Sequence, residues 1–285
     1  MKKILFTGGT GFIGKNVLPI LKQSFGVIAP KRHELDLLDS GEVYQYMQHN
    51  VFDAVVHCAN PNPVKNAVDD RLDTVFENSI RMFMNLYAVR DLYGKLIYTG
   101  SGAEYDKTLD IASVTEQECF RSLPKDSYGL AKYIMNSIAD KSDNIYNLCV
   151  FGCYGPFDFQ TKFITHCINC CMNNKPITIR QECRFDYIHV YDLAEMMCWM
   201  VNNDMFFHMY NASGGASHLL SEIAYEVRHQ MKADVPVIIL FPGMNKEYTA
   251  SGKRFFTESG ISPKISIEEG IRIQIDWQTK GILRI

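Results

Sequence analysis

The segment SYGLAKY, residues 127–133, places a phenol and an ammonium group four residues apart, at Tyr128 and Lys132. Side chains at this spacing share one face of a helix, so the two groups could meet. A free tyrosine ionises near a pH of about 10, and a neighbouring cation lowers its pKa because it favours the phenolate. We expect Lys132 and a second cation bound nearby to bring the pKa of Tyr128 toward neutrality, which would make it a usable acid or base. Taken alone, the same spacing is also common on exposed helices without any chemical role.

A glycine-rich segment, TGGTGFIG at residues 7–14, follows an apolar run and precedes a helix-like stretch. Gly8 permits a tight turn, Gly11 lets a diphosphate lie against the backbone, and Gly14 lets the helix and the strand pack closely. The start of the helix then supplies N–H donors and a positive dipole end for the phosphates. We therefore expect a dinucleotide here; the alternative is a glycine-rich turn without a ligand.

Short apolar runs alternate with longer amphipathic segments through the first half of the chain. The expected strands are residues 2–8, 26–30, 53–59, 95–101 and 145–152, and the expected helices are residues 13–24, 39–50, 73–93 and 127–142. Asp39 is placed to cap the second helix, with Glu42 at its third position. Strands that alternate with helices predict βαβ units with right-handed crossovers. The predicted fold class is α/β, a doubly wound parallel sheet of the Rossmann type with a second, smaller substrate-binding lobe.

The pattern becomes less regular after residue 154, which suggests where the two parts of the chain divide. Residues 1–155 and about 184–214 are expected to form the dinucleotide-binding domain. Residues of about 156–183 and 215–285 are expected to form the substrate-binding lobe. The stretch 184–201 should return to the first domain as a strand and a helix.

The composition is ordinary for a globular protein, with 285 residues, 47% hydrophobic, 21% charged and a net charge of -3. It indicates no basic surface for nucleic acid, and no apolar run approaches the roughly 20 residues that cross a bilayer. Nine scattered cysteines favour a reducing compartment, so we expect a cytoplasmic protein. The cluster CINCC at residues 167–171 lies in an apolar helical stretch without a partner Cys/His pair, so we expect buried thiols and no metal site.

The glycine loop and the Tyr128/Lys132 pair resemble the extended short-chain dehydrogenase/reductase family, the NAD-dependent epimerase/dehydratases that modify nucleotide sugars. The resemblance continues along nearly the whole chain, in HCAN at 57–60, YGP at 154–156, FDYIHVYDLA at 185–194 and SPKISIEEGI at 262–271. The cofactor-binding residues that it implies are Thr7, Gly8, Gly11, Phe12, Ile13, Gly14, Lys31, Arg32, Asp36, Leu37, Cys58, Ala59, Asn60, Asn78, Thr99, Tyr128 and Lys132.

The residues after the second strand bear on which dinucleotide binds. An acidic residue at this place usually grips the ribose 2′-hydroxyl, whereas a 2′-phosphate requires a cation. Here Lys31, Arg32 and His33 follow the strand, and the first carboxylate is that of Glu34. This order favours NADP, with NAD as the alternative. A third interpretation is a solvent-exposed basic turn that binds no ligand.

By the same resemblance, Ser101 takes the place of the family's catalytic serine or threonine. It would hydrogen-bond the substrate oxygen while Tyr128 donates or removes its proton. Dehydratases of the family carry Asp-Glu directly after this position, where this chain has Gly102 and Ala103, so dehydration lacks its machinery. Fucose synthase-like enzymes use a Cys at the Ala103 position and a His aligned with Lys162, and neither is present.

The expected substrate-binding residues are Ser101, Gly102, Lys162 and Arg184, of which Arg184 could meet a diphosphate or form a structural ion pair. Gly152 stands where many relatives have an Asn that meets the nucleotide sugar. Lys253 and Arg254 stand where relatives often have basic nucleotide contacts, the alternative being a solvated face.

Ser101, Tyr128 and Lys132 suffice to move a hydride to or from one carbon. The expected function is an NADPH-dependent reductase of a 4-keto-6-deoxyhexose carried on a nucleotide. The alternative is a nucleotide-sugar 4-epimerase with tightly bound NAD, and a third reading is a non-catalytic dinucleotide sensor on the same fold. The resemblance also implies a homodimer, with a four-helix seam formed by the helices near residues 74–93 and 128–141.

Overall fold

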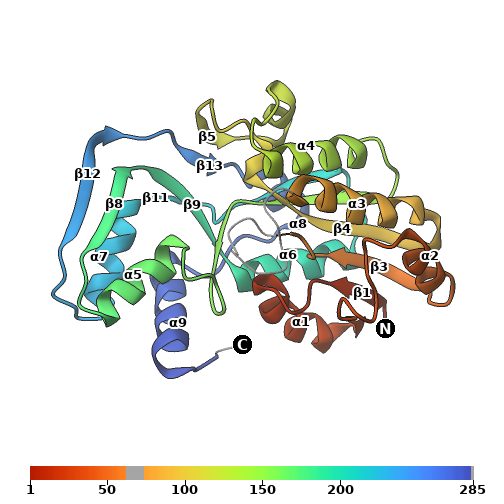
Figure 1. Cartoon of the computed structure of the whole chain (residues 1–285), viewed down its shortest axis with the longest axis horizontal. Helices are drawn as coiled ribbons and strands as arrows, with labels where there is room; N and C mark the ends of the chain where they lie inside the picture. Colours follow the sequence, from red (N-terminus) through yellow and green to blue (C-terminus); the bar gives the residue numbers. More distant parts are fainter. Residues whose placement is uncertain (62–73, 284–285) are drawn as a thin grey trace.

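The computed structural model describes residues 1–61 and 74–283. A six-stranded parallel sheet forms the centre of the larger part of the molecule (Figure 1). Its strands are β1 (Lys3–Thr7), β2 (Gly26–Ile28), β3 (Phe52–His57), β4 (Tyr93–Ser101), β6 (Ile145–Val150) and β10 (Met209–Ala212), in the order β10-β6-β4-β3-β1-β2. Every neighbouring pair is parallel. This arrangement confirms the predicted doubly wound α/β fold.

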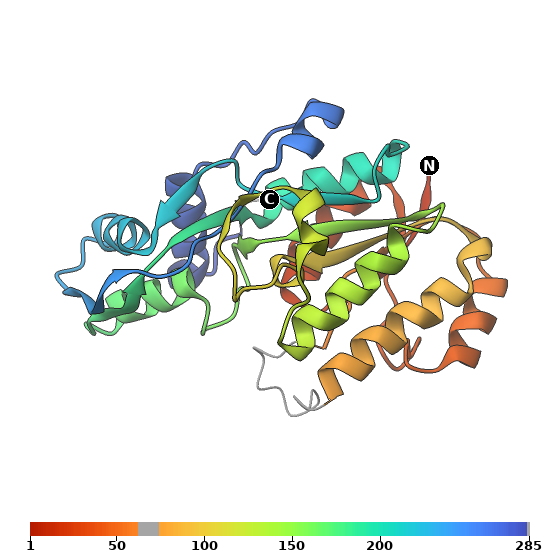
Figure 2. The same ribbon diagram turned by 90° about the horizontal axis from the view of Figure 1, so that it is seen from above.

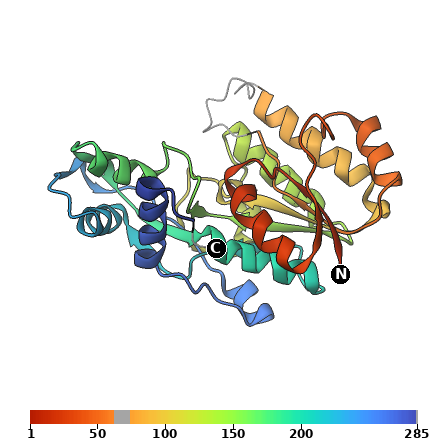
Figure 3. The same cartoon turned by 90° about the horizontal axis from the view of Figure 1, so that it is seen from below.

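Helices cover both faces of this sheet, and the alternation of side chains along β1 explains why. Ile4 and Phe6 pack into a core beneath α1 (Phe12–Ser24) and α6 (Val190–Asn202). Leu5 points to the opposite core, beneath α2 (Ser40–Gln48), α3 (Val75–Ala88) and α4 (Ser127–Ala139). Figures 2 and 3 show these two helical layers from opposite sides. Because both faces are buried, the strands read as continuous apolar runs.

The smaller part of the molecule has its own sheets and core. One sheet has the order β11-β9-β13-β5, with β7 paired to β9, and a second contains β8 and β12. The strands are β5 (Ile111–Val114), β7 (Gly152–Tyr154), β8 (Ile177–Glu182), β9 (Arg184–His189), β11 (Ser217–Leu219), β12 (Val237–Met244) and β13 (Tyr248–Ala250). Helices α5 (Phe163–Met172), α7 (Leu220–Gln230) and α9 (Ile267–Lys280) pack around one apolar cluster.

Two expectations about individual elements need correction. The stretch 184–201 divides between the two parts, because β9 joins the smaller sheet while α6 packs against the large one. The helix expected over 73–93 begins at Val75 and ends at Ala88, and Tyr93 starts β4 instead. Pairing of Tyr93 with Phe52 in the sheet overrides the helical pattern. Residue 73 lies outside the described residues.

The predicted cap of α2 is confirmed. The Asp39 carboxylate accepts hydrogen bonds from Gly41 N at 2.8 Å and Glu42 N at 2.9 Å. The Glu42 side chain accepts instead from Asp36 N, at 3.0 Å, and so fixes the chain that leads into the helix.

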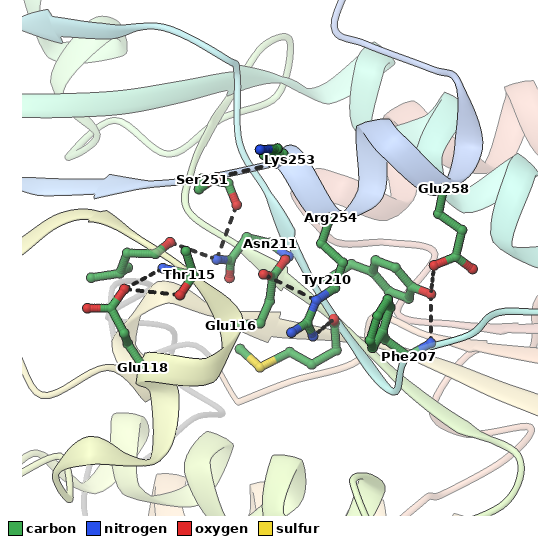
Figure 4. Close-up of polar contacts among 12 residues, drawn as sticks. Thr115, Glu116, Glu118, Phe207, Tyr210, Asn211, Ser251, Lys253, Arg254 and Glu258 are labelled. Atoms are coloured by element: carbon green, nitrogen blue, oxygen red, sulfur yellow. Dashed lines mark hydrogen bonds and ion pairs between the residues drawn. The ribbon is translucent and has the colours of Figure 1, made fainter.

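A buried polar network centred on Asn211 joins the edge strand β10 to segments of the smaller part (Figure 4). The Asn211 amide donates to Val114 O at 3.1 Å, and its backbone N–H donates to Glu116 Oε1 at 2.9 Å. The other oxygen of Glu116 lies 3.4 Å from Nε of Arg254, the second residue of the short helix α8 (Lys253–Ser259). Arg254 therefore forms a largely buried ion pair and does not lie on a solvated face, while a nucleotide contact at this residue stays a prediction.

The nine cysteines are all free, and Cys167, Cys170 and Cys171 are buried in α5 among aliphatic side chains. Among the described helices, none is both long enough and apolar enough to span a membrane. The cytoplasmic location and the division into two domains stay predictions.

Candidate active site

A pocket of about 810 Å³ lies between the carboxyl edge of the large sheet and the smaller part of the molecule. Open α/β sheets bind their ligands at this edge. Residues of the glycine loop, β4, β6 and α4 line one end of the pocket. The rest of the lining comes from residues far away in the sequence, among them Phe159, Lys162, Phe185, Lys246 and Tyr248.

The glycine loop has the geometry that a diphosphate requires. Gly8 has a φ of +80°, and a Cβ there would lie 2.5 Å from Ala59 N. A Cβ on Gly14 would lie 2.2 Å from Gly8 O, so only glycine fits at both positions. A Cβ on Gly11 would meet only Gly8 O, at 3.4 Å, and would otherwise stand in open space beside the pocket. The loop leads into α1 without a side-chain cap, so the N–H groups of the first turn can bind phosphate oxygens.

Ser101, Tyr128 and Lys132 line the same pocket, and their catalytic role stays a prediction. Ser101 ends β4, and Tyr128 is the second residue of α4, whose start is capped by Asp126. A hydrogen bond links the side chains of Ser101 and Tyr128 and lowers the pKa of the phenol. The Lys132 ammonium donates to Thr99 O at 2.9 Å and lies 5.9 Å from the centre of the Tyr128 ring.

Burial dominates the titration of both ionisable groups. It raises the pKa of Tyr128 to about 12 and lowers that of Lys132 to about 8, because each charged form is desolvated. The expectation that Lys132 draws the pKa of Tyr128 below its usual value is therefore wrong for the protein's own groups. The contribution of a nicotinamide cation stays a prediction.

Most of the expected cofactor-binding residues line this pocket. They are Gly8, Gly11, Phe12, Ile13, Gly14, Cys58, Asn60, Thr99, Tyr128 and Lys132. The remaining ones support it or lie outside its lining. Thr7 is buried and its hydroxyl pairs with His57 Nδ1 at 2.8 Å, and Ala59 N donates weakly to the same hydroxyl at 3.4 Å. Asn78 donates to Thr74 Oγ1 at 3.3 Å.

The four expected residues after β2 also lie outside the lining. Leu37 is buried in the core beneath α2 and α3, so its side chain is unavailable to an adenine. Arg32 forms a loose ion pair with Asp36, at 3.9 Å; the Arg32 side chain is largely exposed and that of Asp36 is partly buried. Lys31 is also exposed, with its backbone N–H donating to Glu34 at 2.7 Å.

Of the expected substrate-binding residues, Ser101 and Lys162 line the pocket and Gly102 and Arg184 do not. The Tyr248 side chain fills the space beside Gly102, where a Cβ would lie 2.2 Å from the phenol oxygen. One Arg184 guanidinium nitrogen instead contacts Ser217 O on the paired strand β11, at 3.4 Å.

Sequence reasoning missed Lys107, Lys246 and Tyr248, which also line the pocket. No motif marks them, because pairing of β5 with β13 brings their segments together across more than a hundred residues. Phe185 belongs to the segment FDYIHVYDLA, which carries part of the family resemblance but does not predict that the Phe185 side chain lines the pocket.

Comparison with known proteins identifies a family whose model matches most of the chain. Residues 4–212 match the model of the NAD dependent epimerase/dehydratase family. The chain is 26% identical over 226 residues to GDP-L-colitose synthase of Yersinia pseudotuberculosis, covering 70% of this chain and 72% of that protein.

Solved structures of both reductases and epimerases share the fold. GDP-mannoheptose C4 reductase from Campylobacter jejuni with NADP bound has a TM-score of 0.82 at 17% identity, over 98% of each chain. Thermus thermophilus UDP-glucose 4-epimerase in complex with NAD has a TM-score of 0.80 at 23% identity, over 98% of this chain and 100% of that one.

The glycine loop predicts two different effects of one added methyl group. In Gly11→Ala the methyl should enter the phosphate position, so dinucleotide affinity should fall at least about tenfold while stability changes by less than about 1 kcal/mol. In Gly14→Ala the methyl meets backbone, so stability should fall by about 1–3 kcal/mol or more. Fluorescence titration of the dinucleotide and urea unfolding measure the two effects. Equal loss of stability in both variants would contradict this account.

Proposed function

The chain belongs to the NAD dependent epimerase/dehydratase family, and we propose that it reduces the 4-keto group of a nucleotide-linked 6-deoxyhexose with NADPH. The observation that carries this proposal is the convergence of Ser101, Tyr128 and Lys132 in one pocket beside the glycine loop. Gly102 and Ala103, directly after Ser101, supply no acid or base for dehydration. The similarity to GDP-L-colitose synthase supports a nucleotide-linked sugar as the substrate class, and a GDP-mannoheptose C4 reductase shares the fold.

The proposed reduction adds one hydride and one proton across the C4 carbonyl. The reduced dinucleotide supplies the hydride when it is bound. Ser101 donates a hydrogen bond to the carbonyl oxygen, and Tyr128 transfers its phenolic proton to that oxygen. The Lys132 ammonium stabilises the phenolate that is left, and solvent returns the proton to Tyr128. The products are the secondary alcohol and the oxidised dinucleotide.

The pocket suits an anionic substrate with an aromatic part. Lys107, Lys162 and Lys246 line it, and their ammonium groups can bind a diphosphate as point charges. Phe185 and Tyr248, with ring centres 4.8 Å apart, offer an apolar surface to a sugar or a base. These side chains support a nucleotide sugar as the substrate class.

Removal of one hydroxyl tests the proposed role of Tyr128. Tyr128→Phe should lower kcat for NADPH oxidation by about 100- to 10,000-fold, since the reaction then lacks its proton donor. The assay follows NADPH absorbance with nucleotide-linked 4-keto-6-deoxyhexoses that differ in their base. Tyr133→Phe is the matched control, because this tyrosine lies on the same helix outside the pocket lining. An unchanged kcat in Tyr128→Phe would overturn the proposed role of Tyr128, and no NADPH oxidation by the unchanged protein with any of these substrates would favour the non-catalytic sensor.

A 4-epimerase remains the second candidate, supported by the similarity to an epimerase structure with NAD. An epimerase takes a hydride from C4 and returns it to the other face, so its NAD stays bound and is not consumed. Stoichiometric NAD released from the purified protein, without net NADPH oxidation, would overturn the reductase proposal.

Arg32 tests the choice of dinucleotide. We propose that the exposed Lys31 and Arg32 contact the 2′-phosphate of NADP, and Arg32 is held only loosely by Asp36. Arg32→Ala should raise the Kd of NADPH about tenfold, because a charge-assisted hydrogen bond is lost, and leave that of NADH unchanged. Lys22→Ala, a change at an exposed lysine in the last turn of α1, serves as the control. Equal weakening of both dinucleotides would exclude a 2′-phosphate contact.

We also propose that the protein is a homodimer with α3 and α4 at the seam. The two helices lie side by side on one face of the sheet (Figure 2). Met84 on α3 and, beside α4, Phe120 and Leu123 expose apolar side chains on this side of the molecule. Light scattering of the dilute protein should give twice the 32.6 kDa chain mass. A monomer under these conditions would refute the dimer.

A further inference from the structure

A fully buried carboxylate, that of Glu104, lies directly behind the candidate active site. Glu104 ends a short 3-10 turn, Gly102–Glu104, that follows Ser101, and its exposed fraction is 0%. It is not part of the pocket lining, so it does not touch a substrate there. The proposed reaction assigns no role to this residue.

Two N–H donors hold the Glu104 carboxylate in place. Oε1 accepts from the backbone N–H of Ser101 at 2.8 Å, and Oε2 accepts from the side-chain amide of Asn147 at 2.7 Å. Asn147 lies on β6, the neighbour of β4, and is itself 0% exposed. Because both oxygens accept from N–H groups, the geometry favours the ionised carboxylate, which is an acceptor only.

The backbone of β4 makes room for this pair. A Cβ on Gly100 would lie 2.0 Å from Asn147 Oδ1 and 2.3 Å from Glu104 Oε1. No other residue type fits at Gly100 while both polar side chains stay where they are. The carboxylate therefore occupies a built site next to the strand that ends in Ser101.

The charged and titratable groups that interact with Glu104 come from five elements. They are Tyr98 on β4, Cys119 after β5, Tyr128 and Lys132 on α4, Cys149 on β6 and Tyr248 on β13. Lys132 is the cation among them. The two buried side chains bind the same end of β4, since Lys132 donates to Thr99 O and Glu104 accepts from Ser101 N–H, but they form no direct ion pair within 4.0 Å. Burial raises the pKa of Glu104 to about 8 and lowers that of Lys132, and each charge opposes the shift of the other.

We propose that Glu104 is a positioning residue for the catalytic pair: its carboxylate is the internal counter-ion that keeps Lys132 protonated beside Tyr128. Through the Ser101 N–H it also fixes the turn that presents the Ser101 hydroxyl to the substrate. The effect on turnover rests on the proposed use of Lys132 and Tyr128, whereas the effect on Lys132 itself does not.

Glu104→Gln removes the charge and keeps the shape. The new amide oxygen can still accept from Ser101 N–H, and its NH₂ group can donate to Asn147 once the Asn147 amide turns over. Asn147 Oδ1 is buried without a hydrogen-bond partner, so it is free to become that acceptor. Glu116→Gln is the matched control, since Glu116 is a second buried carboxylate, 4% exposed, that pairs with Arg254 away from Lys132 (Figure 4).

The direct readout is the protonation of Lys132 without substrate or dinucleotide. In protein labelled with ¹³C-lysine, the Cε resonance of Lys132, assigned with Lys132→Arg, reports its titration by NMR. The midpoint should fall by about one to three pH units in Glu104→Gln, because the counter-charge is gone, and stay unchanged in Glu116→Gln. An unchanged midpoint in Glu104→Gln would overturn the proposal.

The pH profile of turnover separates this inference from the proposed function. If Lys132 must be protonated, the alkaline limb of kcat/KM for NADPH oxidation should move to lower pH in Glu104→Gln. If Glu104→Gln lowers the Lys132 midpoint but the unchanged protein reduces no keto sugar, the reductase proposal is wrong and the counter-ion proposal is supported.

A second variant covers the case in which Glu104→Gln does not fold. Asn147→Ser removes the amide N–H donor to the carboxylate of Glu104. Because this donor favours the ionised form, its loss should raise the pKa of Glu104 and move the Lys132 midpoint in the same direction as Glu104→Gln. An unmoved midpoint in Asn147→Ser would also overturn the proposal.

Discussion

Lys132, a residue that is only 2% exposed, places its ammonium group against the carboxyl end of β4, and the other groups of the site surround it. Burying an ammonium group is costly unless hydrogen bonds and a counter-charge offset its lost hydration. Thr99 O supplies a hydrogen bond, the Tyr128 ring lies 5.9 Å away, and Glu104 supplies negative charge from behind. The elements that carry these groups, β4, the 3-10 turn and α4, are therefore constrained together. A shift of any one of them would leave Lys132 poorly compensated.

The same edge of the sheet is closed by segments from elsewhere in the chain. Strand β5, which precedes α4 in the sequence, pairs with β13 near the end of the chain, and Tyr248 of β13 pairs with Ile111. The Asn211 network then joins β10 of the large sheet to this pairing, through Val114 and Glu116. The cofactor end of the pocket is thus built by successive βα units of the large sheet, whereas the substrate end, with Phe185, Lys246 and Tyr248, depends on long-range pairing. This separation lets one dinucleotide-binding frame serve different substrates.

Local patterns explain what the sequence could predict. The glycine loop, the cap at Asp39 and the Tyr128/Lys132 spacing each depend on residues close in the chain, and the structure reproduces their geometry. The substrate end could not be predicted, because Lys246 and Tyr248 reach the pocket only through the β5–β13 pairing. The raised pKa of Tyr128 was also missed, since spacing predicts the neighbouring charge but not the burial that outweighs it.

This sequence has Gly102 where related dehydratases have an acidic residue, and the Tyr248 side chain occupies the space beside Gly102. The phenol oxygen of Tyr248 lies 2.2 Å from where a Cβ of residue 102 would be, and Phe151 crowds the same space at 2.8 Å. A carboxylate side chain directly after Ser101 is therefore sterically incompatible with Tyr248 in this position. A change toward dehydration would have to displace the Tyr248 side chain before it could add an acid at residue 102. The absence of that acid thus follows from the packing of the substrate end, which places a phenol where a dehydratase needs a carboxylate.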